Sequence, residues 1–172
     1  MTLPSNRANW QPAEAALVVA AARDWLGTPY RHQASCKNAG TDCLGLVRGV
    51  YRTICGCEPE AVPPYAITPQ AHEGEALLHA AQRHLLVLPG KLHVDARVDN
   101  VAAGEVLLFR LQSGLPIRHC AIALGNGSMI HAMVGLAVCE VPLTRWWLRH
   151  CAARFVFPAP KASPCNREIC HE

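Results

Sequence analysis

Apolar residues recur at two different spacings along the chain, and this difference divides it into a helical first part and a stranded second part. In the first part they fall three and four positions apart, the spacing of one face of an α-helix. In the second part they form short runs separated by turn residues, which is typical of buried strands. The pattern predicts helices over 13–26, 70–86 and from 43 to 54–56. It predicts strands over 106–109, 117–124, 128–134, 136–141 and 153–157, a short strand near 92–94, and helical turns within 143–151.

Helices followed by consecutive strands predict an α+β domain, with N-terminal helices packed on one side of an antiparallel β-sheet. A chain of 172 residues can bury a real core. No internal repeat or linker divides it, so we expect one domain over residues 1–157, with residues 1–11 as an N-terminal arm. The polar, proline-containing stretch 158–172 is expected to be a disordered tail.

Composition and charge exclude several classes of protein. Hydrophobic residues make up 51% of the chain and charged residues 17%, as in a globular protein. The net charge of +3 is too small to indicate a nucleic-acid partner. No stretch is long enough to span a bilayer, and the apolar run 15–22 lacks the features of a secretory signal. We therefore expect synthesis in the cytoplasm and no membrane span.

Nine cysteines are present, an odd number that cannot all pair within one chain. In a reducing cytosol they are expected to be thiols. The nearest pairs, Cys55 with Cys57 and Cys165 with Cys170, lack the spacing of a structural zinc site. We expect no metal and no cofactor.

Cys43 stands where a polar loop turns into a predicted helix. Asp42 before it is a good N-cap residue, because its carboxylate can accept a hydrogen bond from the free N–H groups of the first turn. At the first helical position, those N–H groups and the helix dipole favour negative charge, so a thiol loses its proton more readily. Cys43 is therefore a candidate nucleophile. A small buried cysteine without chemistry is the alternative interpretation.

His119 and His131 flank a turn at residues 125–127, and the loop length decides whether they share a face. With a two-residue turn the two side chains point to opposite faces, because side chains alternate along a strand. With a three-residue loop, His131 lies opposite Ala121 and the histidines become diagonal neighbours on one face. The sequence permits either loop, although glycine at position 127 suits the longer one. A function that uses both histidines requires the three-residue loop.

A catalytic triad follows if the helix N-terminus that carries Cys43 packs against the face that carries the histidines. His119 would take the thiol proton as general base and later protonate the leaving amine. His131 would hydrogen-bond the other ring nitrogen of His119 and hold its orientation. Cys120, next to His119, is expected on the opposite face of its strand as a core residue. The alternative is a structural thiol and two core histidines.

Four blocks of sequence resemble the signature of the NlpC-type cysteine peptidases, in the same order. A strand that begins Gly104-Glu105-Val106 also resembles the Gly-Asp-Val strand of that family, and the resemblance covers roughly residues 13–157. The blocks are Gly27-Thr28-Pro29-Tyr30, Asp42-Cys43-x-Gly45-Leu46-Val47, Arg118-His119 through Gly127, and Met129-Ile130-His131-Ala132.

The resemblance implies a papain-like fold and hydrolysis of peptide bonds in bacterial cell-wall peptidoglycan, typically between D-glutamate and a diamino acid. It makes Cys43 the nucleophile, His119 the base and His131 the orienting residue. Tyr30 matches the tyrosine that helps to stabilise the oxyanion, beside the backbone N–H of Cys43. The implied partner is a peptidoglycan stem peptide.

Two positions depart from the family pattern. Leu44 stands where serine usually follows the cysteine, and residues 32–34 replace the usual Trp-Gly-Gly. These positions line the substrate cleft in the family, so the bond that is cleaved stays open. We expect Asp42 to cap the helix and also to bind a substrate amine, and Arg31 and Arg118 to meet substrate carboxylates.

The stretches Tyr-Arg-His-Gln-Ala-Ser and Asp-Cys-Leu-Gly-Leu-Val-Arg-Gly look most like the branch found with phage tails and gene-transfer particles. This likeness implies phage-like tail proteins as partners and a particle that carries the enzyme to the cell wall. Two other functions remain open. One is a non-catalytic tail-assembly or wall-binding module on the same fold. The other is an amidase or acyltransferase, which would be marked by an apolar cleft that accommodates lipid.

Overall fold

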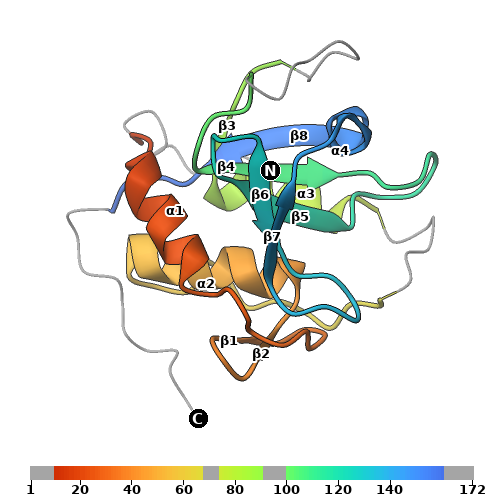
Figure 1. Cartoon of the computed structure of the whole chain (residues 1–172), viewed down its shortest axis with the longest axis horizontal. Helices are drawn as coiled ribbons and strands as arrows, with labels where there is room; N and C mark the ends of the chain where they lie inside the picture. The colour runs from red at the N-terminus through yellow and green to blue at the C-terminus, as the bar shows by residue number, and fades with distance from the viewer. Residues whose placement is uncertain (1–9, 68–73, 91–99, 161–172) are drawn as a thin grey trace.

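The computed structural model describes residues 10–67, 74–90 and 100–160, and these form helices and an antiparallel sheet as the sequence predicts (Figure 1). The expected α+β class is confirmed. The helices are α1 (Ala15–Arg23), α2 (Cys43–Cys55), α3 (Ala76–His84) and α4 (Arg145–His150). The strands are β1 (Ser35–Cys36), β2 (Gly40–Thr41), β3 (Leu86–Val87), β4 (Glu105–Phe109), β5 (His119–Ala123), β6 (Ser128–His131), β7 (Cys139–Pro142) and β8 (Cys151–Val156).

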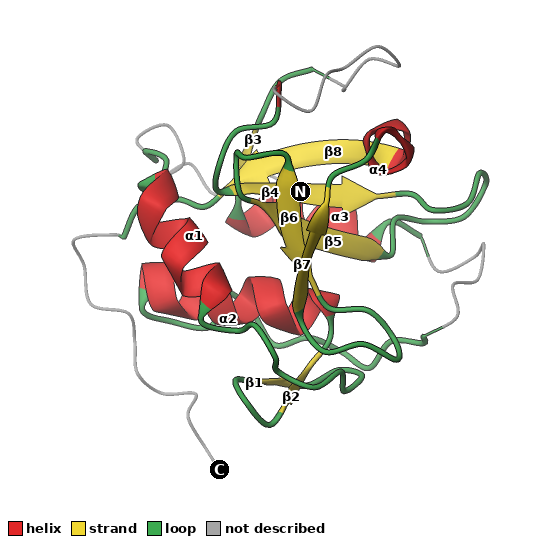
Figure 2. Ribbon diagram, in the orientation of Figure 1, coloured by secondary structure: helices red, strands yellow, loops and turns green. Residues whose placement is uncertain are grey.

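Six strands form one sheet in the order β3-β8-β4-β5-β6-β7, and every neighbouring pair is antiparallel (Figure 2). The strands β4 and β5 lie at its centre and are fully buried because both faces of the sheet are covered. One face packs against α1 and α2 through a core that includes Val18, Leu46, Val50, Val106, Leu108 and Ile122. The other face packs against α4 through a second, smaller core that includes Leu107, Ala121, Met129, Leu143 and Leu148.

The sequence places the long helices and central strands well but misses the short elements. The helix predicted from Cys43 is observed, and it ends at Gly56 in the left-handed conformation (φ 79°). The strand expected over 136–141 begins only at residue 139, since residues 132–138 form a loop. The two-residue strands β1, β2 and β3 lie in stretches read as loop or helix, because two residues carry too little periodicity to detect. The expected strand near 92–94 and the start of the helix over 70–86 lie outside the described residues.

The two ends of the described chain are paired with each other. Pro12 and Pro158 form an antiparallel bridge, and the Ala159 N–H donates to the Gln11 carbonyl at 2.7 Å. The paired structure therefore extends beyond residue 157, where the tail was expected to begin. No helix among the described residues is long and apolar enough to cross a membrane.

Candidate active site

The turn into α2 fixes the backbone of Cys43. The Asp42 Oδ1 atom accepts a hydrogen bond from the Gly45 N–H at 2.8 Å, which is the predicted N-cap bond. Gly45 has to be glycine, because a Cβ atom there would lie 1.9 Å from the Ala34 carbonyl oxygen. Cys43 is thus the first residue of the helix, where a backbone N–H has no acceptor within the helix.

Tyr30 is held beside this turn by the backbone. It forms a parallel bridge with Thr41, and the Thr41 N–H donates to the Pro29 carbonyl at 3.0 Å. Burial raises the pKa of Tyr30, and the negative charges of Asp42 and Cys43 raise it further. The phenol therefore keeps its proton near neutral pH and can donate a hydrogen bond next to the nucleophile.

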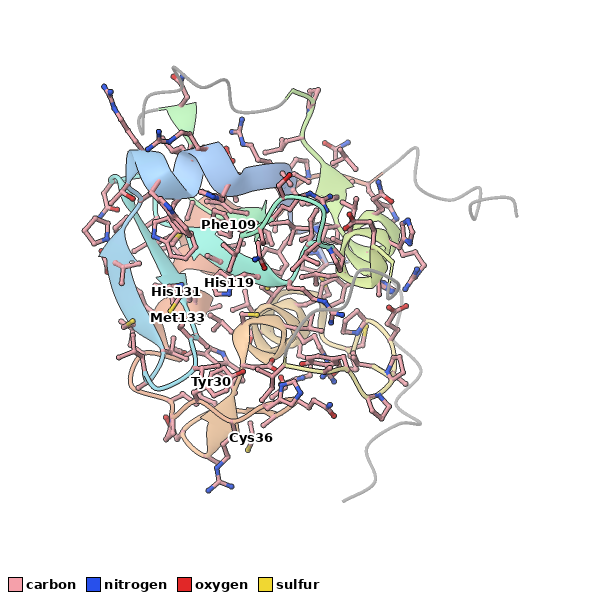
Figure 3. All side chains as sticks on the ribbon, turned by 90° about the vertical axis from the view of Figure 1, so that its right-hand side faces the viewer. Tyr30, Cys36, Phe109, His119, His131 and Met133 are labelled. Carbon is pink, nitrogen blue, oxygen red and sulfur yellow. The ribbon has the colours of Figure 1, made fainter. Side chains whose placement is uncertain are left out.

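The β5–β6 hairpin has the three-residue loop that a function using both His119 and His131 requires. Ile122 pairs with Ile130, which places His131 opposite Ala121, and the loop residue Gly127 is left-handed (φ 82°). His119 and His131 consequently share a face, and the His119 Nε2 atom lies 3.0 Å from the His131 Nδ1 atom. Figure 3 shows His119 and His131 next to each other, with Tyr30 farther down, toward Cys36.

The histidines do not lie on the face that α2 covers, so the hypothesis that the helix packs against their face is wrong. Their neighbours are Phe109 and Trp147, whose ring centroids lie 5.8 and 5.5 Å from that of His119. Trp147 also contacts His131 edge to face, at 5.4 Å. Cys43 instead reaches His119 at the end of β5, where its Sγ atom lies 3.8 Å from the carbonyl oxygen of the preceding residue, Arg118. The aromatic rings confine both imidazoles without competing for their ring nitrogens.

Two side chains, the Cys120 thiol and the His119 imidazole, act on the pKa of the Cys43 thiol. The hydrogen bond from Cys120 lowers the pKa of Cys43 most, burial opposes this effect, and His119 lowers the pKa further. The same contact raises the pKa of Cys120, which stays a neutral donor. Cys120 is buried in the core as expected, at 1% exposure, but its contact with Cys43 was missed by sequence reasoning. The position of Cys120 next to His119 was the only feature of the sequence that could have indicated this contact.

His131 remains neutral at physiological pH. Burial lowers its pKa to about 4, and the neighbouring His119 adds to this shift. A neutral His131 whose Nδ1 accepts a hydrogen bond requires the proton of His119 to be on Nε2. The Nδ1 atom of His119 is then the ring nitrogen left for the Cys43 thiol. The His119–His131 pair is thus arranged to accept a proton at the Nδ1 atom of His119.

The sequence of the chain matches the NlpC/P60 family profile over residues 27–154. The chain belongs to the NlpC/P60 family. Members of this family are generally cysteine peptidases and peptidoglycan hydrolases. A comparison with curated proteins finds no match.

Solved structures of NlpC/P60 domains share the papain-like fold of this chain. The NlpC/p60 domain of the peptidoglycan hydrolase SagA is 24% identical, with a TM-score of 0.50, over 87% of this chain and all of that domain. An NlpC/P60 protein from Bacillus cereus is 20% identical, with a TM-score of 0.54, over 86% of this chain and 41% of its own. NlpC2 from Trichomonas vaginalis is 16% identical, with a TM-score of 0.55, over 87% of this chain and 48% of its own. At these identities the likeness shows the fold alone.

The remaining candidate residues of this NlpC/P60 domain occupy different surroundings. Arg31 is exposed, and Arg118 is half-buried beside Cys43. Asp42 is only 2% exposed, and its Oδ2 atom accepts hydrogen bonds from the Gln33 N–H at 2.7 Å and the Tyr65 hydroxyl at 2.5 Å. The capping role of Asp42 is thus visible in the structure, whereas binding of a substrate amine stays a prediction. Tyr65 was missed, because nothing in its local sequence points to a partner 23 residues earlier.

Proposed function

We propose that this chain is a cysteine peptidase that hydrolyses peptide bonds in the stem peptides of bacterial peptidoglycan. The observation that carries the proposal is the position of the Cys43 thiol at the start of β5, 3.8 Å from the Arg118 carbonyl oxygen and thus next to the His119–His131 pair. A nucleophile, a base and a group that orients the base are the parts that acyl transfer through a cysteine requires. Family membership points to the same chemistry.

The residues supply each step of such a reaction. His119 takes the thiol proton, and the Cys43 thiolate attacks the carbonyl carbon of the scissile bond. The developing oxyanion accepts hydrogen bonds from the Cys43 N–H and the Tyr30 hydroxyl. His119 then protonates the leaving amine, and a water molecule that it deprotonates releases the acyl group from sulfur. His131 holds the imidazole in the required tautomer throughout.

The proposed scissile bond and the proposed delivery of the chain to the cell wall follow from the family resemblance. The proposed scissile bond joins D-glutamate to a diamino acid, with Arg31 and Arg118 meeting carboxylates of the stem peptide. Likeness to the phage-tail branch supports delivery to the wall on a phage-like particle. Mass spectrometry of purified particles would find this chain among the tail proteins if that assignment holds.

Digestion of purified peptidoglycan tests the activity directly. Wild type and Cys43→Ala are incubated with the substrate under reducing conditions, and the soluble products are identified by mass spectrometry. Fragments released by the wild type alone establish the peptidase and identify the bond. If the folded wild-type protein releases none, the peptidase proposal fails, and a non-catalytic assembly or wall-binding module becomes the better explanation.

A second function, an amidase or acyltransferase, is favoured by one observation. The Cys43 thiol borders a cavity whose walls are mostly aliphatic.

A further inference from the structure

A cavity of about 510 Å³ lies beside the nucleophile, on the face of the sheet that α2 covers. It is bounded by α2, α3, the segment 59–65 and the strands β4 and β5, and Cys43 and Cys120 are among the residues that line it. Its volume lies within the range of about 300–1,000 Å³ that is typical of small-molecule sites. It is therefore larger than a single peptide side chain needs, and the cysteine that would form a bond with the substrate lines it.

The walls of this cavity are aliphatic along most of their length. Of the charged groups that border it, Arg48 is paired with Glu58 at 2.7 Å, and Arg83 is paired with Glu60 at 2.6 Å. Arg118, His79 and His84 also border the cavity. The aliphatic part of these walls offers a carboxylate no polar partner in place of the hydration that it would lose there. The principal apolar lining residues are Leu44, Val47, Leu77, Leu85, Val106 and Leu108.

Leu44 connects the cavity to an unusual feature of the sequence. The resembling family usually has serine directly after the catalytic cysteine, and this chain has leucine. In the structure Leu44 lines the cavity next to Cys43. Leu44 thus adds an apolar side chain to the cavity wall beside the nucleophile.

We propose that the cavity is the subsite for an unbranched apolar acyl chain, of the fatty-acyl type, whose carbonyl carbon is presented to Cys43. The inference rests on Cys43 as the nucleophile of the proposed function, but goes beyond a stem peptide, which carries no such chain. The thiolate forms a C–S bond with the acyl carbon, and the C–N or C–O bond to the leaving group breaks. His119 gives its proton to the leaving group. Water then attacks the thioester carbon while His119 takes its proton, so that the carboxylic acid and the thiolate are released.

The test measures turnover of p-nitrophenyl esters with acetyl, butyryl, hexanoyl and octanoyl chains. Four full-length proteins are compared: wild type, Cys43→Ala, Ala80→Phe and Gln82→Phe. Ala80 lines the cavity from α3 and is half-buried, so phenylalanine there fills space in the cavity. Gln82 is exposed on the same helix and does not border the cavity, so its variant adds the same bulk elsewhere.

The proposal predicts that kcat/KM of the wild type rises about fourfold for each methylene that enters the cavity. The Gln82→Phe variant should keep this gradient, Ala80→Phe should lose it beyond butyryl, and Cys43→Ala should be inactive on every ester. Equal turnover of all chain lengths by an active wild type would overturn the acyl subsite and leave the cysteine hydrolase standing.

A binding experiment separates failure of the subsite from failure of the catalytic residues. Sodium decanoate is titrated into Cys43→Ala, with and without Ala80→Phe, and followed by isothermal calorimetry. Binding that the phenylalanine abolishes supports the subsite even if no ester is turned over, in which case the nucleophile assignment fails instead. Absence of both decanoate binding and a chain-length gradient overturns the inference.

Discussion

Replacement of His131 separates its hydrogen-bonding role from its packing role. His131 is 3% exposed, and its Nδ1 atom lies 3.0 Å from the His119 Nε2 atom. Leucine has a similar volume but no acceptor, so His131→Leu leaves the His119 Nε2–H buried without a partner. Asparagine is a matched control, because its Oδ1 atom takes a position close to that of the histidine Nδ1 atom.

The structure sets the size of the expected effect. A buried donor that loses its acceptor costs about 1–3 kcal/mol. The His119 ring carries a positive charge after it takes the thiol proton, so this cost falls on the transition state more than on the free enzyme. At about 1.4 kcal/mol for each factor of ten, kcat of His131→Leu should fall by about 5- to 150-fold. His131→Asn should keep most of the wild-type kcat.

The assay is steady-state hydrolysis of a stem peptide by the three proteins, with thermal unfolding measured alongside to show that each is folded. The change should appear in kcat rather than in KM, since His131 acts through His119. A wild-type kcat in the leucine variant would refute the orienting role. Equal losses in the leucine and asparagine variants would show that the imidazole itself matters, and not the acceptor.

Three further outcomes are expected. Because the hydrogen bond from Cys120 lowers the pKa of Cys43, Cys120→Ala should move the pH profile of Cys43 alkylation by iodoacetamide to higher pH. Cys120→Ser keeps a donor and should move the profile less. An unchanged profile in the alanine variant would argue against the contact. His131 has a pKa of about 4 in the folded chain against an ordinary value of 6.5, so the unfolded chain binds the proton first as the pH falls. The free energy of unfolding, measured by urea denaturation, should therefore fall by about 3 kcal/mol from pH 6.5 to 4. His131→Asn should lack this contribution to the pH dependence. Gly45→Ala should lower the free energy of unfolding by about 1–3 kcal/mol, although alanine favours helices, because its Cβ would overlap the Ala34 carbonyl; a stabilised variant would contradict the close approach.

Local patterns in the sequence were sufficient for the parts of the site that depend on neighbouring residues. The start of α2 at Cys43 follows from a capping carboxylate and helical spacing, and both are local signals. The shared face of His119 and His131 follows from the parity of a hairpin, once the three-residue loop is chosen. The family resemblance grouped these pieces, and the family profile matches the chain over residues 27–154.

Contacts between distant segments were beyond this reasoning. The packing of all the strands decides which face of the sheet α2 covers. The hypothesis that α2 packs on the face with the histidines was therefore made without any local signal that could test it. The same holds for Tyr65, which meets Asp42 from a proline-rich loop, and for the aliphatic cavity, whose walls come from five separate parts of the chain. Side chains that define substrate preference lie mostly in such contacts between distant segments.

The hydrogen bond between Tyr65 and Asp42 links the two sides of the nucleophile thermodynamically. Tyr65 borders the cavity, while Asp42 caps the helix that carries Cys43. A substrate amine at the Asp42 carboxylate would compete with the Tyr65 hydroxyl for that group. If an amine displaced Tyr65 from Asp42, occupancy of the cavity and recognition of the amine would be coupled, and each would change the affinity for the other by the same factor. Selectivity would then be a property of the whole substrate rather than a sum over its two halves.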